Sequence, residues 1–263
     1  MGVLNVTPDS FSDGGAFLDH DAALRHGSEM AAQGATIIDL GGESSRPGSD
    51  PVPLDEELRR VLPLIRPLRE RFPQVFISID TYKAETARRA LEAGADIVND
   101  ITALRGDPDM TEVVRSAGAG VILMHMKGSP KTMQISPSYS DVVAEVFSFL
   151  RERRDLAVAH GIPMEKIAID PGFGFGKRLI DNIKLARHLN TFTALGHPVV
   201  VGISKKSPLA QLLGNPKLSF DDRVWPTVAF TSLLREKGAN ILRVHEVNQN
   251  LQALRMTEAI LAQ

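Results

Sequence analysis

Polar side chains recur wherever a short apolar run of this sequence ends. The apolar runs span residues 3–6, 36–40, 75–80, 97–100, 121–125, 167–170, 199–204 and 241–245. On or directly after them stand Asn5, Asp39, Asp80, Asn99, Asp100, His125, Asp170, Ser204, Lys205, Lys206, Arg243 and His245. A strand that is buried on both faces avoids such groups unless they are paired or face a binding site. One of them alone would be read as a loop cap, but their recurrence at all eight runs indicates one shared site.

The acidic and amide members of this set suit a nitrogen-rich ring. Asp80, Asn99 and Asp170 offer oxygen acceptors and an amide at the ends of different runs. Such groups recognise a flat heterocycle that carries several N–H donors. Phenylalanines in the intervening loops could either sandwich such a ring or plug an apolar gap. These are Phe11, Phe173 and Phe175.

The basic members suit a phosphorylated ligand. Positive charge and N–H donors come from Arg46, Lys206, Arg243 and His245. They favour phosphate or pyrophosphate. The seven histidines show no metal-ligand spacing, so we expect no zinc site built by the protein alone. A Mg²⁺ ion held mainly by phosphate oxygens, with Asn5 as a protein ligand, fits the same residues.

The sequence GFGFGK at residues 172–177 resembles a phosphate-binding P-loop only superficially. The P-loop pattern requires glycine where Pro171 stands, and serine or threonine where Arg178 stands. We therefore interpret this segment as a flexible loop over the site.

The elements that position these residues repeat along the chain. The apolar runs are rich in valine and isoleucine and mostly do not alternate, as expected of strands covered on both faces. Helical stripes lie between them, for example over residues 58–68 and 84–91. Gly-Ala pairs at residues 34–35, 94–95, 118–119 and 238–239 precede four of the runs, where a left-handed glycine ends a helix. Eight strand–helix units predict an α/β fold, a single-domain (β/α)₈ TIM barrel over residues 1–263, with an open doubly wound sheet as the alternative.

Composition excludes several classes of protein. The net charge of −2 gives no general field for nucleic acid or anionic lipid. The absence of cysteine excludes disulfides, thiolate metal sites and cysteine nucleophiles. No apolar run approaches the ~20 residues of a membrane span, and no signal-peptide pattern opens the chain. We therefore expect a cytoplasmic protein without a nucleic-acid or membrane partner.

The same residues carry a resemblance to a known family. The sequence resembles the bacterial dihydropteroate synthase family along essentially its whole length. The matching motifs are NVTPDSFSDGG at residues 5–15, GGESSRPG at 41–48, SIDT at 78–81, NDI at 99–101, MHM at 124–126, DPGFGFGK at 170–177, SKKS at 204–207 and RVH at 243–245. Several long motifs in the right order form a very specific signal.

The resemblance implies a role for individual residues. The implied pterin pocket consists of Asp80, Asn99, Asp170 and Lys206, with Ile101, Met124 and Phe175 along its walls. The implied pyrophosphate contacts are Asn5, Arg46, Arg243 and His245, with Mg²⁺ near Asn5. The implied p-aminobenzoate site is framed by Phe11, Ser45, Pro47, Phe175, Lys206 and Ser207, under loop one (residues 9–15) and loop two (residues 44–48). The implied catalytic residues are Asp9, Asp13, Asp80, Asp170 and Lys206.

The implied activity joins 6-hydroxymethyl-7,8-dihydropterin pyrophosphate to p-aminobenzoate, which yields 7,8-dihydropteroate and pyrophosphate in folate biosynthesis. Pyrophosphate leaves early, and the aniline nitrogen then attacks a delocalised pterin-methyl cation. The resemblance also implies a homodimer formed through outer helices, and sulfonamides as inhibitors. Two alternatives are a pterin-binding methyltransferase domain, which needs no pyrophosphate site, and a non-catalytic pterin-binding protein, which predicts damaged loops. The basic residues and the intact loop motifs favour the synthase.

Three positions depart from the family pattern. Ser45 stands where threonine is common, Lys205 where arginine is usual, and Glu246 where aspartate is usual. None of the changes removes a group assigned to chemistry, and Ser45 is the one expected to alter the fit of p-aminobenzoate analogues such as sulfonamides. The chain also begins almost inside its first strand, which leaves two expectations open: a barrel bottom that is less covered than in other family members, or a sequence that is trimmed at its start.

Overall fold

Eight parallel strands form the centre of the part of the chain that the computed structural model describes, residues 1–7, 20–46 and 48–263. They are β1 (Gly2–Asn5), β2 (Ile37–Gly41), β3 (Phe76–Asp80), β4 (Ile97–Asp100), β5 (Gly120–Met124), β6 (Ile167–Asp170), β7 (Val200–Val201) and β8 (Ile241–Leu242). Each strand overlaps the apolar run that predicted it. Strands β2 and β6 are buried at every residue, which explains why the runs do not alternate.

Two backbone joints close the strands into a barrel. Strands β1 to β6 form one sheet in sequential order, and β7 pairs with β8. Ile169 bridges to Val199 at one edge, and Gly2 bridges to Val244 at the other. The Val3 amide also donates to the Val244 carbonyl at 2.9 Å. The predicted (β/α)₈ barrel is therefore confirmed, and the open sheet is excluded because its edge strands would remain unjoined.

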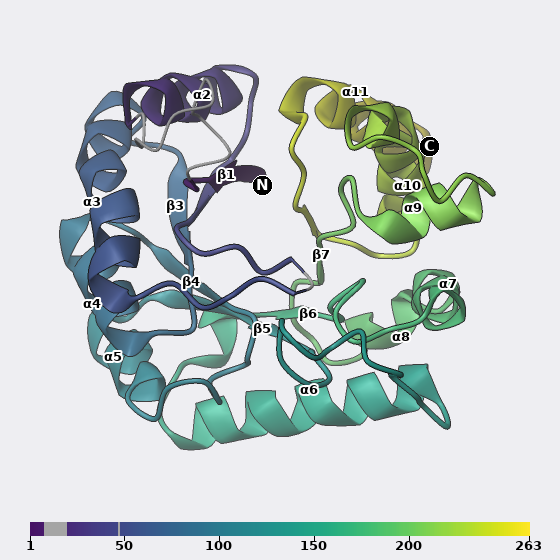
Figure 1. Ribbon diagram of the computed structural model, residues 1–263, viewed down its shortest axis with the longest axis horizontal. Coiled ribbons are helices and arrows are strands. Elements are labelled where there is room, and N and C mark those ends of the chain that lie inside the picture. The colour runs from purple at the N-terminus through teal and green to yellow at the C-terminus, as the bar shows by residue number, and fades with distance from the viewer. Residues whose placement is uncertain (8–19, 47) are drawn as a thin grey trace.

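Helices form a ring outside the strands (Figure 1). They are α2 (His20–Ala32), α3 (Leu54–Arg71), α4 (Ala84–Ala93), α5 (Met110–Ala117), α6 (Val142–Ala159), α7 (Leu179–Arg187), α8 (Asn190–Thr193), α9 (Ser207–Leu212), α10 (Val224–Glu236) and α11 (Val247–Leu261), with 3₁₀ turns η1 (Met164–Lys166) and η2 (Asp221–Arg223). The main hydrophobic core includes Leu4 and Ile79 from the strands and Val61 and Ile65 from α3. This packing fixes the strands, and with them the residues at their carboxyl ends.

Each of the four Gly-Ala pairs ends a helix, as predicted. The glycines at positions 34, 94, 118 and 238 have φ values of 100°, 116°, 60° and 101°. The alanine after each donates its N–H to the carbonyl five residues earlier, as Ala35 does to Met30 at 3.0 Å. This bond defines the Schellman motif. The helix is therefore stopped locally, directly before the next strand.

The loop after β6 is buried and hydrogen-bonded, which differs from the flexible cover that we expected. Phe173 is fully buried in the main core, so it plugs an apolar gap and does not sandwich a ring. Gly172 lies against β5: a Cβ there would stand 1.9 Å from the His125 carbonyl oxygen. This contact and the φ of 71° require glycine at that position.

A buried ammonium group holds this loop to the end of β5. Lys177 is 3% exposed, and its Nζ lies 2.9 Å from His125 Nδ1 and donates to the carbonyls of Gly172 at 2.8 Å and Phe175 at 3.0 Å. Burial lowers the pKa of Lys177 well below its usual value. Burial also lowers the pKa of His125 far below its usual value, and Lys177 adds to that effect. The neutral imidazole can therefore accept a hydrogen bond from Lys177.

We predict that Lys177→Met lowers the free energy of unfolding by about 3 kcal/mol, because buried carbonyl acceptors lose their donor. Urea denaturation of purified protein measures this change. Lys184→Met, at an exposed position on α7, is the matched control and should leave the stability nearly unchanged. Equal stability of the two variants would contradict the anchoring role of Lys177.

Candidate active site

An ion-pair network fills the carboxyl end of the barrel. Arg243, which follows β8, donates from Nε to Asp39 Oδ2 at 2.6 Å and from Nη2 to Asp80 Oδ2 at 2.7 Å. Asn99 Nδ2 donates to the same Asp39 oxygen at 3.1 Å. Strands β2, β3 and β4 thus meet the segment after β8. Because the Asn99 amide nitrogen is used by Asp39, its carboxamide oxygen is the group that can accept from a ligand.

Burial shifts the pKa values of two ionisable side chains of this site. It raises the pKa of Asp80 to about 7 against the opposing effect of Arg243. It also lowers the pKa of Lys206 to about 7, although Asp170 opposes the change. For Arg243, burial is outweighed by the carboxylates of Asp39 and Asp80, which raise its pKa. Burial thus disfavours the charged forms of Asp80 and Lys206, whereas the neighbouring carboxylates keep the Arg243 guanidinium charged.

Asp170 and Lys206 lie toward β6 and β7. Asp170 is buried, its Oδ1 accepts from the Gly172 amide at 2.7 Å, and burial raises its pKa. Lys206 Nζ donates to the Phe173 carbonyl at 2.7 Å and lies 4.2 Å from the centre of the Phe175 ring. This places a cation, a carboxylate and an aromatic ring together.

The predicted pocket walls form one apolar cluster. Ile101, Met124 and Phe175 pack together with Met126 and Met133, which the sequence reasoning missed. They come from loops and strand ends of β4, β5 and β6. Acceptors and apolar surface thus meet at one end of the barrel, as a planar heterocycle requires.

Residues that we expected to bind the anion lie on the side of β7 and β8. His245 Nδ1 is 2.9 Å from Ser204 Oγ, and the Phe220 ring meets the His245 ring edge-on at 5.4 Å. The Arg46 guanidinium of loop two lies 5.4 Å from the centre of the same Phe220 ring. The structure therefore brings Arg46 to the side of His245. Phe220 has no counterpart in the predicted set, since no spacing in the sequence links residue 220 to loop two.

The charge expected of His245 needs correction. Burial lowers its pKa to about 3, and the neighbouring Arg243 and Lys205 cations lower it further. His245 therefore contributes a neutral imidazole, which can donate one hydrogen bond but adds no positive charge at neutral pH. Arg243 supplies charge, but its donors Nε and Nη2 are engaged by Asp39 and Asp80.

Asn5 faces Asp80 across the end of β2. A Cβ on Gly41 would lie 3.5 Å from Asn5 Oδ1 and 3.8 Å from Asp80 Oδ2. Among the described residues, no group of three or more His, Asp or Glu side chains is arranged to hold a metal ion. A neutral amide oxygen beside one carboxylate fits a Mg²⁺ ion that takes most of its ligands from phosphate and water.

The remaining predicted residues lie at the mouth of the barrel or outside the described part of the chain. Ser207 begins α9 directly after Lys206, and Ser45 precedes Arg46 in loop two. The predictions for Asp9, Phe11, Asp13 and Pro47 fall on residues that the structure does not describe.

An ionic cluster that the sequence reasoning missed fixes the start of loop two. Lys83 Nζ donates to Glu43 Oε2 and Glu57 Oε2, each at 2.6 Å, and Tyr82 donates to Glu43 Oε1 at 2.8 Å. The Val52 amide donates to Glu43 at 2.9 Å. Glu43 belongs to the GGESSRPG motif, and this membership is the signal that could have identified it. Its carboxylate ties both ends of the loop to the starts of α3 and α4.

One strand-end carboxylate does have the simple role of a loop cap. Asp100 Oδ1 accepts from the Thr102 amide at 2.7 Å, and its Oδ2 accepts from the Leu104 amide at 2.8 Å. Asp39, in contrast, was predicted to lie at a strand end but was given no role. It proves central to the site, because it accepts hydrogen bonds from both Arg243 and Asn99.

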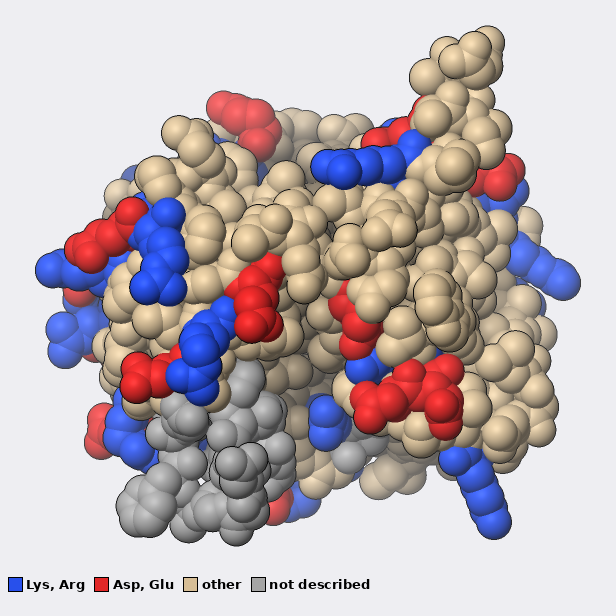
Figure 2. All heavy atoms as spheres, turned by 90° about the horizontal axis from the view of Figure 1, so that it is seen from above, with Lys and Arg blue, Asp and Glu red and all other residues tan. Residues whose placement is uncertain are grey.

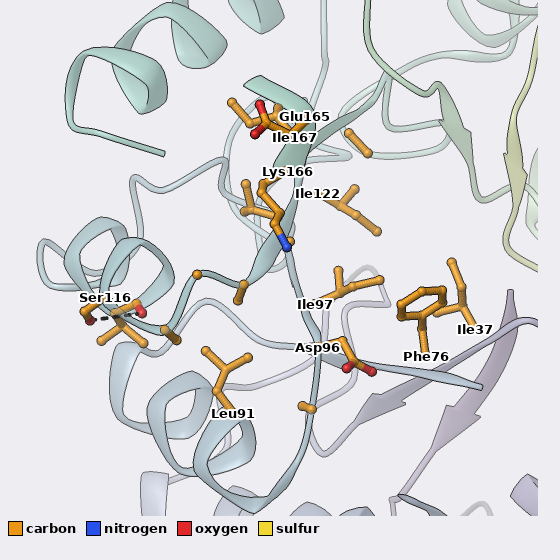
Figure 3. Close-up of a pocket in the computed structure, with 18 of the residues that line it drawn as sticks. Ile37, Phe76, Leu91, Asp96, Ile97, Ser116, Ile122, Glu165, Lys166 and Ile167 are labelled. Atoms are coloured by element: carbon orange, nitrogen blue, oxygen red, sulfur yellow. Dashed lines mark hydrogen bonds between the residues drawn. The ribbon is translucent and has the colours of Figure 1, made fainter. Parts of the chain in front are cut away.

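A cavity of about 1020 Å³ lies at the opposite end of the barrel (Figure 3). Figure 3 shows Ile37, Phe76 and Ile97 from the strand starts side by side. None of the predicted site residues lines this cavity. Because barrel enzymes place their chemistry at the carboxyl ends of the strands, we assign no reaction to it.

Charged side chains of both signs share the surface, and the lack of a nucleic-acid partner stays a prediction. On the face shown in Figure 2, acidic and basic side chains of the described residues are interspersed and form no field of one sign. Within residues 1–7, 20–46 and 48–263, no helix is long and apolar enough to cross a membrane. The cytoplasmic location stays a prediction.

Comparison with known proteins agrees with this geometry. The sequence model of the family described as "Pterin binding enzyme" matches residues 1–245. The chain is 44% identical to dihydropteroate synthase of Escherichia coli strain K12 over 262 residues, which cover 100% of this chain and 91% of that protein.

Solved structures give the same result. A dihydropteroate synthase of Yersinia pestis in a sulfonamide drug complex matches with a TM-score of 0.93 at 43% identity, over 100% of this chain and 94% of that one. A Xanthomonas albilineans dihydropteroate synthase with 4-aminobenzoic acid also matches with a TM-score of 0.93, at 44% identity, over 100% and 92% of the two chains. The resemblance drawn from the motifs is therefore confirmed: the chain belongs to the pterin-binding enzymes and, among them, to the dihydropteroate synthases, which are transferases.

Proposed function

We propose that this chain condenses 6-hydroxymethyl-7,8-dihydropterin pyrophosphate with p-aminobenzoate, yielding 7,8-dihydropteroate and pyrophosphate. The observation that carries the proposal is the meeting of two sets of residues at one end of the barrel. Asp80, Asn99 and Asp170 form an acceptor-rich floor, and Arg46 with His245 lies beside it. A pterin-binding methyltransferase would need only the first set.

The pterin ring is held by its N–H edge and its faces. Asp170 Oδ2 and the Asn99 carboxamide oxygen accept from the ring N–H groups. The other polar atom of each side chain, Asp170 Oδ1 and Asn99 Nδ2, already forms a hydrogen bond within the protein. Lys206 donates to a ring acceptor, and the cluster of Ile101, Met124 and Phe175 contacts the ring. The low polarity of this wall strengthens the hydrogen bonds on the floor.

Departure of pyrophosphate opens the reaction. The C–O bond to pyrophosphate breaks, and the positive charge left on the pterin methylene is delocalised over the ring near the carboxylates of Asp80 and Asp170. Arg46 and His245 donate to the departing oxygens, since the structure gathers them on the side of β7 and β8. Mg²⁺ bound with the pyrophosphate, with Asn5 as its protein ligand, would neutralise the leaving group.

Attack by p-aminobenzoate completes the exchange. The aniline nitrogen forms the new C–N bond and then releases one proton. Lys206, Phe175, Ser207 and Ser45 frame this substrate. The contributions expected of Asp9, Phe11, Asp13 and Pro47 fall on residues that the structure does not describe. The chain acts by positioning and by excluding water, without a protein nucleophile.

The proposed activity predicts stoichiometric product formation. Purified protein with 6-hydroxymethyl-7,8-dihydropterin pyrophosphate, p-aminobenzoate and Mg²⁺ should release equal amounts of pyrophosphate and 7,8-dihydropteroate, and EDTA should abolish both. Added sulfonamide should compete with p-aminobenzoate. Binding of the pterin substrate without either product would refute the synthase activity and favour the methyltransferase or the binding protein.

Asp80→Asn should lower kcat roughly 100-fold while the affinity for dihydropterin pyrophosphate changes far less. The amide keeps the shape of the side chain but removes the negative charge that stabilises the pterin-methyl cation. Steady-state kinetics and calorimetric binding measure the two quantities. Asp155→Asn, at an exposed carboxylate on α6 outside the site, is the matched control and should keep kcat near the wild-type value. Unchanged turnover in Asp80→Asn would remove Asp80 from the mechanism.

We also propose a homodimer formed through α10 and α11. These two packed helices carry large apolar side chains that are exposed: Trp225 (71%), Leu233, Met256 (66%), Ile260 (67%) and Leu261. A surface patch of this kind on neighbouring helices typically marks a protein interface. A second copy of the same chain covers such a patch symmetrically.

Light scattering of the wild type should give twice the chain mass of 28.6 kDa. Trp225→Glu and Met256→Glu should shift the protein to the single-chain mass, because a charge at an apolar interface is costly to bury. Ile135→Glu, at an exposed apolar residue outside these helices, should leave the mass unchanged. A wild type with the mass of one chain would refute the dimer.

A further inference from the structure

Lys205 and Glu246 lie directly beside two proposed binding residues, Lys206 and His245. Their side chains form an ion pair and are only 7% and 19% exposed. Lys205 Nζ also lies 3.3 Å from Asp221 Oδ1, but that carboxylate is 91% exposed. A buried pair that loses one partner leaves an uncompensated charge, whereas an exposed pair contributes little. Glu246 is therefore the partner that matters to Lys205.

Backbone pairing between β7 and β8 stops before it reaches these residues. The last paired residues are Val201 and Leu242, followed by one hydrogen bond from the Arg243 amide to the Val201 carbonyl at 2.9 Å. The two segments then continue side by side through side chains: Ser204 Oγ contacts the His245 ring and amide at 2.9 Å and 3.2 Å, and Lys205 pairs with Glu246. These contacts take the place of the missing sheet hydrogen bonds.

The backbone of Lys205 is held in an unfavourable conformation. Its φ is 56°, which a residue with a side chain keeps only where its surroundings enforce it. The Lys205 amide donates to Thr227 Oγ1, and Arg223 donates to the Lys205 carbonyl, both at 3.0 Å. The Lys206 amide closes the turn by donating to the Ile203 carbonyl at 3.1 Å. This turn directs Lys206 toward Phe175.

The Phe220 ring lies beside the ammonium group of this ion pair. Lys205 Nζ lies 4.5 Å from the centre of this ring, which is the same ring that contacts Arg46 and His245. An apolar cover strengthens the attraction between the two charges by excluding water. The pair, the ring and the anion-binding residues therefore form one packed unit.

We propose that the Lys205–Glu246 ion pair is a brace that positions Lys206 and His245, without contacting either substrate. The pair also links two of the three departures from the family pattern. Lys205 is shorter than the usual arginine and Glu246 is longer than the usual aspartate, so each change compensates for the other. This inference rests on the proposed function of Lys206 and His245.

Substitutions at Lys205 and Glu246 test whether the ion pair acts as a brace. Lys205→Met and Glu246→Gln should each lower kcat/KM for dihydropterin pyrophosphate roughly tenfold or more, mainly through KM. Each should also weaken the binding of inorganic pyrophosphate in the presence of Mg²⁺, measured by calorimetry. Lys205→Arg and Glu246→Asp should each impair the enzyme, whereas the double variant with both changes should recover most of the lost kcat/KM. Arg115→Met, which breaks an exposed pair on α5, is the control.

If the ion pair had a purely structural role, the variants would have a lower melting temperature but would not show this pattern of KM change and rescue. That result would overturn the proposed brace. Should Lys205→Met fail to fold, Lys205→Gly decides, because glycine keeps the left-handed turn but lacks the ammonium. An active wild type whose Lys205 and Glu246 variants keep their KM would reject the brace and leave the proposed function intact. An inactive wild type would reject the proposed function, and pyrophosphate binding would still test the brace.

Discussion

The attraction between Arg243 and the two carboxylates of Asp39 and Asp80 is the interaction on which the site depends. Without this guanidinium, two buried carboxylates would lie near each other with no cation to pair with, which is costly. The guanidinium donates to one oxygen of each with separate N–H groups, in a planar arrangement that lysine could not reproduce. Asp39 in turn orients Asn99. The floor of the pocket is therefore one electrostatic unit, and its members cannot be exchanged singly.

Around this floor the loops are held by buried charges of their own. Lys177 fastens the loop after β6 through carbonyl groups, and Glu43 with Lys83 fastens loop two. In each case a charged side chain replaces the regular hydrogen bonds that loops lack. The Phe175 wall and the Arg46 side of the site thereby acquire defined positions relative to the strands.

Much of the fold could be predicted from the sequence because its signals are local. Apolar runs mark the strands, and Gly-Ala pairs mark the helix ends through the backbone preference of glycine. The strand-end residues Asp80, Asn99 and Asp170 could be predicted in the same way, since the end of a parallel strand sets where a side chain lies.

What the sequence could not supply are pairings between distant residues and the charges that result from them. Arg243 and Asp39 are 204 residues apart, so no local pattern connects them. Lys177 appears as an ordinary surface lysine until its carbonyl partners surround it. His245 appears cationic, but burial next to Arg243 removes the proton.

Closure of the barrel also has a consequence for the order in which the chain folds. Neighbouring strand–helix units pair with their successors, so their contacts join residues that are close in the chain. The joint between Gly2 and Val244 connects the two ends of the described barrel, and the entropy lost in closing so long a loop makes such contacts slow to form. Arg243 stands next to that joint. The floor of the pocket therefore depends on a long-range joint, and a chain that has formed only its sequential strand–helix units still lacks its binding site.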